Sequence, residues 1–278
     1  MTIQKTAQLR TFLVHLILLL TAAGFAAPLV WMLLTSLKDN SQLFASPPQW
    51  LPSPVHLQNY AEAFSRISLP RLLSNTLIVS LFSALGMLLT APLAAYSLAK
   101  LEWKGRSLIF AVTIGVMMVP GQVTMIPEFI LFYKLGLVGT LIPLIVKPAL
   151  GVPVYIFMLR QFFLGLPSEL QQAARIDGAS EGYIYWSIML RLAMPAVLAT
   201  GLFQIMASWN DFLGPLLYLN DPAQYTLSLG LQQFQNEIST EWNLLMAAAF
   251  LMILPILILF FFLQRTFIQG ITFTGIKG

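Results

Sequence analysis

Long stretches without a charged side chain divide this sequence, and they restrict its fold more than any other feature. Only 9% of the 278 residues are Asp, Glu, Lys or Arg, while 58% are hydrophobic and the mean hydropathy is +0.78. A soluble domain rarely exceeds about half apolar residues. A transmembrane helix needs about 20 apolar residues, a length that the charge-free stretches reach. The sequence therefore predicts an all-α polytopic membrane protein.

Six of these stretches are expected to cross the bilayer. The first lies between Arg10 and Lys38. A signal peptide is the alternative reading, because Arg10 precedes the apolar run and an Ala-rich segment follows. The run continues through Leu33 and Leu34, beyond a normal signal sequence, which favours a retained helix. The other five spans are expected at residues 72–99, 107–127, about 141–159, about 192–213, and 244–263.

Proline and glycine are expected to interrupt two of these spans. Pro120 and Gly121 should break or kink the outer end of the third span. The fourth span contains Pro148, Gly151 and Pro153 as well as a lysine, Lys147. It is therefore the least regular of the six.

The polar segments give a simple division of the chain. Residues 1–71 form an N-terminal helix and a Pro-rich extracytoplasmic loop, expected to be an extended surface loop from Lys38 to Arg71. Residues 72–264 form the transmembrane core with a cytoplasmic loop at 160–191, and 265–278 form a tail. Within the core we expect an amphipathic connection at 128–140, a short interfacial helix at 181–191 and a hydrophilic loop at 220–243.

Lys and Arg in the short connections indicate the orientation. With the N-terminus inside, ten of the 15 lie in the cytoplasm, four lie outside (Lys38, Arg66, Arg71 and Lys134), and Lys147 lies in the membrane. The net charge of +4 is scattered and forms no nucleic-acid patch. Both termini and the loop at 160–191 are therefore predicted to be cytoplasmic.

One polar stretch, residues 166–179, stands out in that loop. It is too short and too polar to span a membrane. Ser168 with Gln171 three residues on predicts a capping box, and Gly178 predicts a left-handed helix end. Ala173 and Ala174 should leave a smooth patch that another surface could approach closely. An ordinary surface loop is the alternative.

The sequence offers no chemistry of its own. It has no cysteine, and its two histidines, His15 and His56, are isolated, so neither thiolate chemistry nor a metal site is expected. Residues 270–277 approach a phosphate-binding loop, but the lysine is displaced by one position and no Ser or Thr follows it. Enzyme activity is not expected. A self-sufficient secondary transporter would need inverted repeats, and none is evident.

Residues 172–179 (Gln-Ala-Ala-Arg-Ile-Asp-Gly-Ala), with nine residues between Gly178 and Ile188, resemble the EAA loop of binding-protein-dependent ABC importer permeases. The carbohydrate branch, especially the smaller permease subunit of maltose-type importers, is similar over nearly the whole chain. Its further matches are residues 36–38, 47–52 with 59–60, 209–212, 225–227, 264–265 and 275–278. Two positions depart from the pattern, because Gln172 replaces the motif's glutamate and Arg191 replaces a proline.

The resemblance implies a type I permease fold in a bacterial or archaeal inner membrane. It also implies a second permease subunit, two ABC ATPase subunits that use ATP and Mg, and an extracytoplasmic solute-binding protein. No cofactor is implied for this chain itself. The coupling helix would contact an ATPase, and the outer loop would reach toward the binding protein. The residues implied are, for coupling, Glu169, Gln172, Ala173, Ala174, Arg175, Asp177 and Gly178, and, for the outer loop, Gln232, Gln233, Gln235 and Asn236.

Polar side chains within the spans are candidates for the substrate path. Gln204, Ser208 and Asp211 fall at i, i+4 and i+7 and share a helix face, and Trp209 and Asn210 lie beside them. Amides, carboxylates and aromatic rings are groups that hold sugars, although the same groups also join helices.

Lys147 could snorkel outward, pair with Asp211 or Glu128, or face a cavity; snorkelling is the simplest expectation. The cargo expected from the family is an oligosaccharide or a polyol glycoside. A charged cargo such as a glycerol phosphate is the alternative.

Overall fold

The computed structural model describes residues 2–234 and 240–272, and the side chains of residues 10–234 and 240–262. Every element longer than a single bridge residue in that part of the chain is a helix. The residues group into two compact units, residues 1–69 with 231–255, and residues 70–230 with 256–278. The all-α prediction is confirmed.

The described residues contain four helices long and apolar enough to cross a membrane, and six spans if each of two bent helix pairs counts as one. The unbroken ones are α1 (Thr2–Ser36), α4 (Leu69–Lys100) and α15 (Trp242–Thr272). The fourth candidate consists of α7 (Ile142–Ala149) and α8 (Pro153–Gly165). The predicted polytopic fold is therefore confirmed, and the count of six spans is reached when each bent pair is one span.

The predicted breaks occur where proline and glycine stand. The third span is α5 (Arg106–Met117) followed by α6 (Gly121–Lys134), bent by 101° at Pro120. In the fourth span, Gly151 adopts φ +110°, a left-handed conformation that suits glycine, and α8 begins at Pro153. The connection expected at 128–140 was wrong in part, because α6 continues through Glu128 to Lys134.

The fifth span also begins with a bend. Helix α12 (Met194–Asn210) follows the helical segment 181–192 at an angle of 76°. That segment comprises α10 (Glu181–Tyr183), a π-helical stretch η1 (Ile184–Met189) and α11 (Leu190–Leu192), so residues 181–191 are helical as expected. Three short helices follow α12 in this unit: α13 (Leu213–Tyr218), η2 (Pro222–Gln224) and α14 (Leu227–Gly230).

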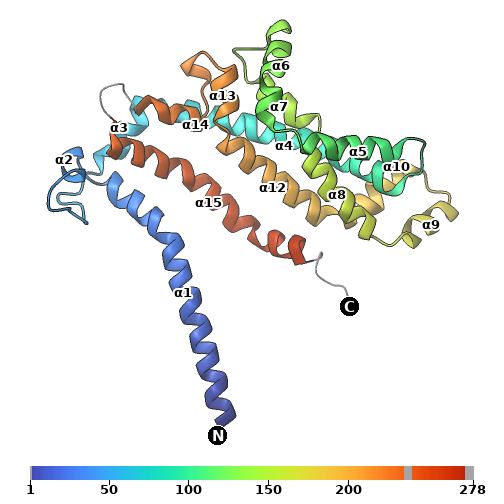
Figure 1. Cartoon of the computed structure of the whole chain (residues 1–278), viewed down its shortest axis with the longest axis horizontal. Helices are drawn as coiled ribbons and strands as arrows, with labels where there is room; N and C mark the ends of the chain where they lie inside the picture. The colour runs from blue at the N-terminus through green and yellow to red at the C-terminus, as the bar shows by residue number, and fades with distance from the viewer. Residues whose placement is uncertain (1, 235–239, 273–278) are drawn as a thin grey trace. The chain divides into compact units, whose positions relative to one another are not determined.

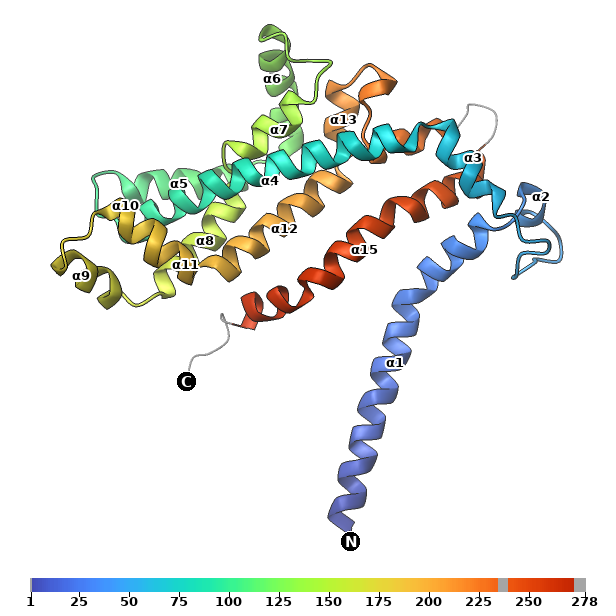
Figure 2. The same ribbon diagram turned by 180° about the vertical axis from the view of Figure 1, so that it is seen from behind.

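In the second unit, two apolar clusters lie along α4. One contains Met87, Tyr96, Leu159, Phe163 and Ile184, and includes residues of α4, α8, η1 and α12. The other contains Val79, Phe132, Leu144, Tyr218 and Leu229. Figures 1 and 2 show α9 and α10 near the C-terminal end of α4, and α13 and α14 toward its other end. Residues of the two predicted loops, 160–191 and 220–243, therefore lie toward opposite ends of α4 in this unit.

Small residues bring α4 and the broken fourth span together. A Cβ built on Gly86 would overlap the side chain of Ala149 and lie 2.9 Å from its Cα atom. The Thr90 hydroxyl, one turn further along α4, donates to the Ala149 carbonyl at 2.9 Å. Such close approach is typical of helix pairs in membranes.

The segment after α1 was expected to be an extended surface loop, and this was wrong only in part: residues 45–57 form no helix and most are exposed, but a short helix lies on each side of them. These helices are α2 (Asn40–Leu43) and α3 (Gln58–Arg66). Lys38 is only 2% exposed; its ammonium donates to the Gln49 carbonyl at 2.5 Å and lies 5.2 Å from the Trp31 ring centroid. The Asn59 amide donates to the carbonyls of Ser36 and Lys38, which ties α3 to the end of α1. Polar side chains that find backbone partners order this loop.

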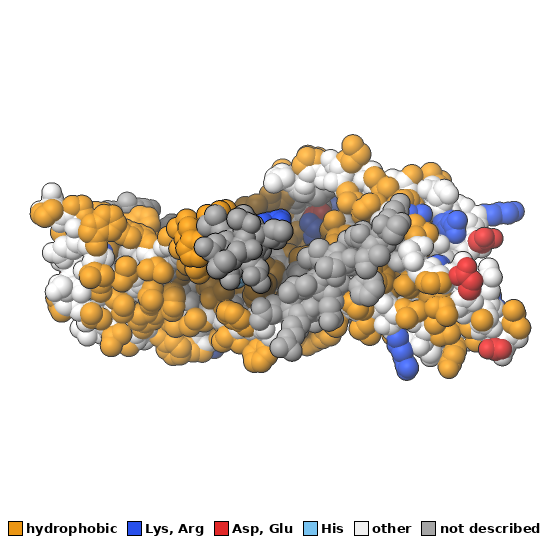
Figure 3. Space-filling model, turned by 90° about the horizontal axis from the view of Figure 1, so that it is seen from below, with side chains coloured by type: hydrophobic (Ala, Val, Ile, Leu, Met, Phe, Trp, Pro, Cys, Tyr) orange, Lys and Arg blue, Asp and Glu red, His pale blue; other side chains and the backbone are white. Residues whose placement is uncertain are grey.

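Hydrophobic and charged side chains occupy different parts of the surface. Hydrophobic side chains cover much of the face in Figure 3, and many of the visible Lys, Arg, Asp and Glu side chains gather at the end of the second unit that carries α9. The exposed apolar side chains include Phe82, Leu89, Leu108 and Ile130, and are those of a chain surrounded by lipid or partner helices.

Candidate functional site

The polar stretch at residues 166–179 forms helix α9 (Glu169–Ile176). Its C-terminal end is as predicted: Gly178 has φ +82°, its N–H donates to Arg175 O, and the Ala179 N–H donates to Ala174 O. This is a Schellman motif. The predicted capping box was wrong. Ser168 already has helical dihedral angles and its side chain accepts no capping bond, and the Gln171 amide donates to Tyr96 and Glu181.

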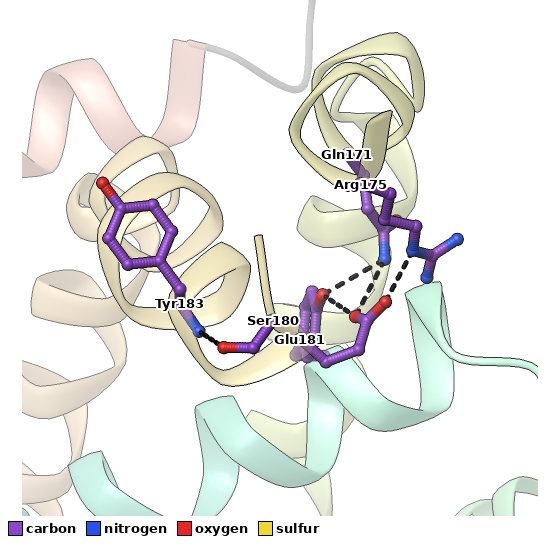
Figure 4. A network of polar contacts seen from close by, with 6 residues as sticks. Gln171, Arg175, Ser180, Glu181 and Tyr183 are labelled. Carbon is purple, nitrogen blue, oxygen red and sulfur yellow. Dashed lines mark hydrogen bonds and ion pairs between the residues drawn. The ribbon is translucent and has the colours of Figure 1, made fainter. Parts of the chain in front are cut away.

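A polar network joins α9 to α10 and α4 (Figure 4). The Arg175 Nε donates to Glu181 Oε1 at 2.5 Å, and the Gln171 amide donates to Glu181 Oε2 at 3.4 Å and to the Tyr96 hydroxyl at 3.2 Å. Tyr96 in turn donates to Glu181 at 3.1 Å. These donors, Arg175 first, hold the pKa of the Glu181 carboxyl below its usual value. Glu181 is thus the acceptor on which three elements converge.

The two alanines of α9 have different surroundings, so the single smooth patch expected from them was wrong. Ala174 is 8% exposed and packs in the apolar cluster with Tyr96 and Phe163, whereas Ala173 is exposed. Adjacent residues lie about 100° apart on a helix, so one faces the core and the other faces out. The outward side also carries Glu169, Gln172 and Asp177, together with Ile176, which is 86% exposed.

A cavity of about 540 Å³ lies in the second unit, lined by residues of α4, α6, α7, α8, α12 and α13. The break of the fourth span contributes Gly151, Val152 and Pro153. Non-helical backbone at membrane depth is tolerated where it lines such a cavity. The polar and charged side chains of the lining are Gln122, Glu128, Lys147, Gln204, Ser208 and Asp211.

The predicted face of α12 does point to this cavity. The Gln204 amide donates to the Ser208 hydroxyl at 2.8 Å, and Ser208 shares a hydrogen bond of 2.9 Å with Ser83 of α4. Asp211, directly after α12, accepts a bond from the Gly214 N–H at 3.1 Å. Gln204 and Ser208 are nearly buried, so they both join α12 to α4 and present polar atoms to the cavity.

Lys147 pairs with Glu128, one of the alternatives expected for it, and not with solvent as the simpler snorkelling expectation had it. Its ammonium lies 2.5 Å from Glu128 Oε2, so α7 and α6 are linked by an ion pair in the cavity wall. The ion pair forms because α6 extends beyond its predicted end and carries Glu128 along the cavity.

Other candidates lie apart from the cavity lining. Trp209 is 3% exposed, and its indole N–H has no hydrogen-bond partner within the described part of the chain. Asn210 is exposed and donates to the Met206 carbonyl. In the outer loop, Gln232 and Gln233 are exposed on η3 (Leu231–Phe234), whereas Gln235 and Asn236 lie outside the described residues.

A comparison with known protein families shows to which family the chain belongs. Residues 86–273 match the family described as "Binding-protein-dependent transport system inner membrane component". The chain belongs to this family.

Among family members, the chain is 34% identical to an arabinooligosaccharides transport system permease protein, AraQ, of Halalkalibacterium halodurans, over 99% of both chains. It is 34% identical to a sulfoquinovosyl glycerol transport system permease protein, SmoH, of Agrobacterium fabrum, over 90% of this chain and 88% of that one. A crystal structure of a bacterial ABC transporter involved in the import of the acidic polysaccharide alginate has a chain of the same fold, with TM-score 0.80, 20% identity, and coverage of 94% and 97%.

Several residues that position α9 or line the cavity of this chain were not predicted from the sequence. Tyr96, Gln171 and Glu181 fix α9, yet Tyr96 and Glu181 are 85 residues apart in sequence. Glu128 was considered only as one partner for Lys147. Ile176 stands within the motif, and its position opposite Ala174 could have marked it as exposed.

Proposed function

We propose that this chain is a permease subunit of an ATP-driven importer that moves an oligosaccharide or a polyol glycoside, and that it forms half of the translocation path. The observation that carries the proposal is the cavity of about 540 Å³ whose wall combines Gln204, Ser208 and Asp211 on one face. Amide and hydroxyl groups can exchange hydrogen bonds with sugar hydroxyls. The name of one relative, an arabinooligosaccharides permease, supports this cargo class, and the name of the other, a sulfoquinovosyl glycerol permease, supports a glycoside whose sugar carries a sulfonate.

Helix α9 is the proposed contact with a separate ATPase subunit that binds ATP and Mg. Its exposed side offers Glu169, Gln172, Ala173, Asp177 and the nearly fully exposed Ile176. An exposed isoleucine beside a small residue suits insertion into a groove. The opposite side is fastened to α10 and α4 by Arg175, Gln171 and Ala174, so a displacement of α9 would be passed to the spans.

The mechanism we propose is alternating access. Closure of two ATPase subunits would move the coupling helices of this chain and of a second permease subunit, and the cavity would open outward to receive cargo from a binding protein. Gln232 and Gln233, together with Gln235 and Asn236, are the proposed contacts with that protein. In this arrangement both termini are cytoplasmic, in a bacterial or archaeal inner membrane.

The side chains of the cavity lining give a glycerol phosphate cargo less support than a neutral one. Lys147 is the one Lys or Arg in the described cavity lining, and Glu128 already pairs with it at 2.5 Å. A phosphate would have to replace that carboxylate and would also meet Asp211.

The test is reconstitution of this chain with its second permease subunit, ATPase subunits and binding protein in proteoliposomes. ATP-dependent uptake of an arabinooligosaccharide or a related glycoside is expected, with none when the ATPase is omitted. Uptake that continues without the ATPase would instead favour a secondary transporter, and the absence of uptake of any sugar would refute the proposal.

A further inference from the structure

The cavity lining contains an uneven set of charges. Glu128 of α6 and Lys147 of α7 form an ion pair of 2.5 Å. Asp211 has no Lys or Arg within ion-pair distance in the described part of the chain; its side chain accepts a hydrogen bond from the Gly214 N–H instead. The described lining therefore holds two carboxylates and one ammonium group. When both carboxylates are ionised, one negative charge is left over.

We propose that this chain's wall of the cavity is a charge filter that admits neutral and cationic sugars and retards anionic ones. Asp211 supplies the surplus negative charge, and Glu128 prevents Lys147 from attracting anions. The proposal rests on the proposed function, in which cargo passes this cavity, and it narrows the cargo class. It also assigns Asp211 and Glu128 as specificity-determining residues.

The surroundings of Asp211 strengthen its field. Val79, Leu144, Leu213 and Leu217 line the same cavity, and apolar walls of low dielectric focus field lines into the open space. Such focusing changes the local concentration of a charged solute by a factor of about 10 or more.

The position of Asp211 is also fixed. Its backbone carbonyl accepts a bond from the Ser228 hydroxyl at 2.5 Å, and its side chain caps the start of α13 through Gly214. A Cβ built on Gly214 would overlap the Asp211 carboxylate, so the glycine leaves the space that this carboxylate occupies. These contacts therefore hold the carboxylate of Asp211 at the C-terminal end of α12.

The chain has no cysteine, which permits a direct test. In the assembled transporter in membranes, a thiol introduced by Met125→Cys in the cavity lining is treated with two methanethiosulfonate reagents, one carrying an ammonium group and one a sulfonate. Asn220→Cys, exposed in the outer loop and not in the lining, is the reference. Modification is read on this chain alone, so partner thiols do not interfere.

The cationic-to-anionic rate ratio is expected to be on the order of tenfold higher at the cavity thiol than at the reference. Because both reagents attack the same thiol, differences in its pKa or in general accessibility cancel from the ratio. Equal ratios at the two positions would overturn the filter.

Charge variants made in the Met125→Cys background separate the roles of Asp211 and Glu128. Asp211→Asn should bring the ratio close to the reference value, and Glu128→Gln with Asp211→Asn should invert it by releasing Lys147. Asp221→Asn, an exposed aspartate of the outer loop, should leave it unchanged. Should Asp211→Asn prevent assembly, Glu128→Gln alone must still lower the ratio; an unchanged ratio there contradicts the proposal.

A transport measurement distinguishes this proposal from the proposed function. At saturating binding protein, a neutral glycoside should be imported about ten times faster than its counterpart oxidised to a uronic acid. If neither is imported, the proposed function fails while the reagent ratio still decides the filter. If both are imported equally and the ratio shows no bias, the filter fails and the proposed function stands.

Discussion

The guanidinium of Arg175 lies 2.5 Å from the carboxylate of Glu181, and this contact joins the exposed helix α9 to the start of α10. Both side chains are nearly half exposed, so the ion pair alone contributes about 0–1 kcal/mol. Glu181 also accepts from Tyr96 and Gln171, and removing it leaves those donors without that acceptor. The contact between Arg175 and Glu181 thus helps to set the orientation of α9 as well as its stability.

Substitution of Glu181 should loosen α9 without unfolding the chain. We expect Glu181→Gln to weaken the docking of α9 by about 1–2 kcal/mol, because one charged acceptor of several hydrogen bonds is lost. Hydrogen exchange of residues 169–177 should accelerate, and cargo-stimulated ATP hydrolysis should fall. Glu169→Gln, which removes an equal charge from the exposed side of α9, should leave the exchange unchanged.

The same contact should depend on pH. The pKa of Glu181 in the folded protein is below its ordinary value of 4.5, chiefly because Arg175 donates to it. A depressed carboxyl pKa contributes stability that is present above the ordinary value and is lost as the pH falls through the folded value. Proteolysis within residues 166–181 should therefore increase below about pH 4.5, and Glu181→Gln should flatten that dependence. An unchanged profile in the variant would falsify the role of Glu181.

The two adjacent alanines should respond oppositely to enlargement. Ala174→Leu forces a side chain into a filled cluster and should cost about 1–3 kcal/mol of stability. Ala173→Leu meets no such cluster, so the fold should be retained while association with the ATPase is lost. Thermal unfolding and co-purification of the ATPase measure the two effects. Retained association and uptake in Ala173→Leu would contradict the coupling assignment.

Gly86 should tolerate no side chain. A Cβ there meets Ala149, including its backbone, so Gly86→Ala should displace α7 and lower the stability by about 1–3 kcal/mol. Gly115, in α5, has nothing within 4 Å of a built Cβ, and Gly115→Ala should be neutral or stabilising by about 0.5–1 kcal/mol. The difference between the two melting temperatures is the measurement, and equal shifts would dismiss the close contact.

The polar cluster of α12 should matter for cargo. Gln204→Ala removes the donor to Ser208 and a polar group of the cavity, and we expect a several-fold increase in the KM of uptake. Asn210→Ala, which changes an exposed amide outside the lining, should have little effect. An unchanged KM for Gln204→Ala would assign that residue to helix packing alone.

Much of the fold was predictable because a membrane limits the choices. Charge-free stretches of about 20 residues located the spans, and Pro120, Gly151 and Pro153 marked real breaks because they lack a backbone donor or favour a left-handed angle. The end of α9 was predictable for the same local reason, since Gly178 alone supplies the required conformation.

What was missed depends on contacts between distant residues. Gln171 looked like half of a capping box, but Tyr96, 75 residues earlier, provides a competing partner. Lys147 looked like a snorkelling side chain until Glu128 was brought beside it across 19 residues. The division of Ala173 and Ala174 between surface and core was readable from helix geometry, but which one faces inward depends on how α9 docks.

Lys38 has a practical consequence for mapping how the chain crosses the membrane. Its amine is buried, donates to the Gln49 carbonyl and sits near the Trp31 ring. An acylating dye would therefore miss Lys38 from either side of the membrane, whereas exposed amines such as Lys134 can react with a dye that reaches them. A labelling experiment that relied on Lys38 would assign the segment after α1 to the wrong side of the bilayer.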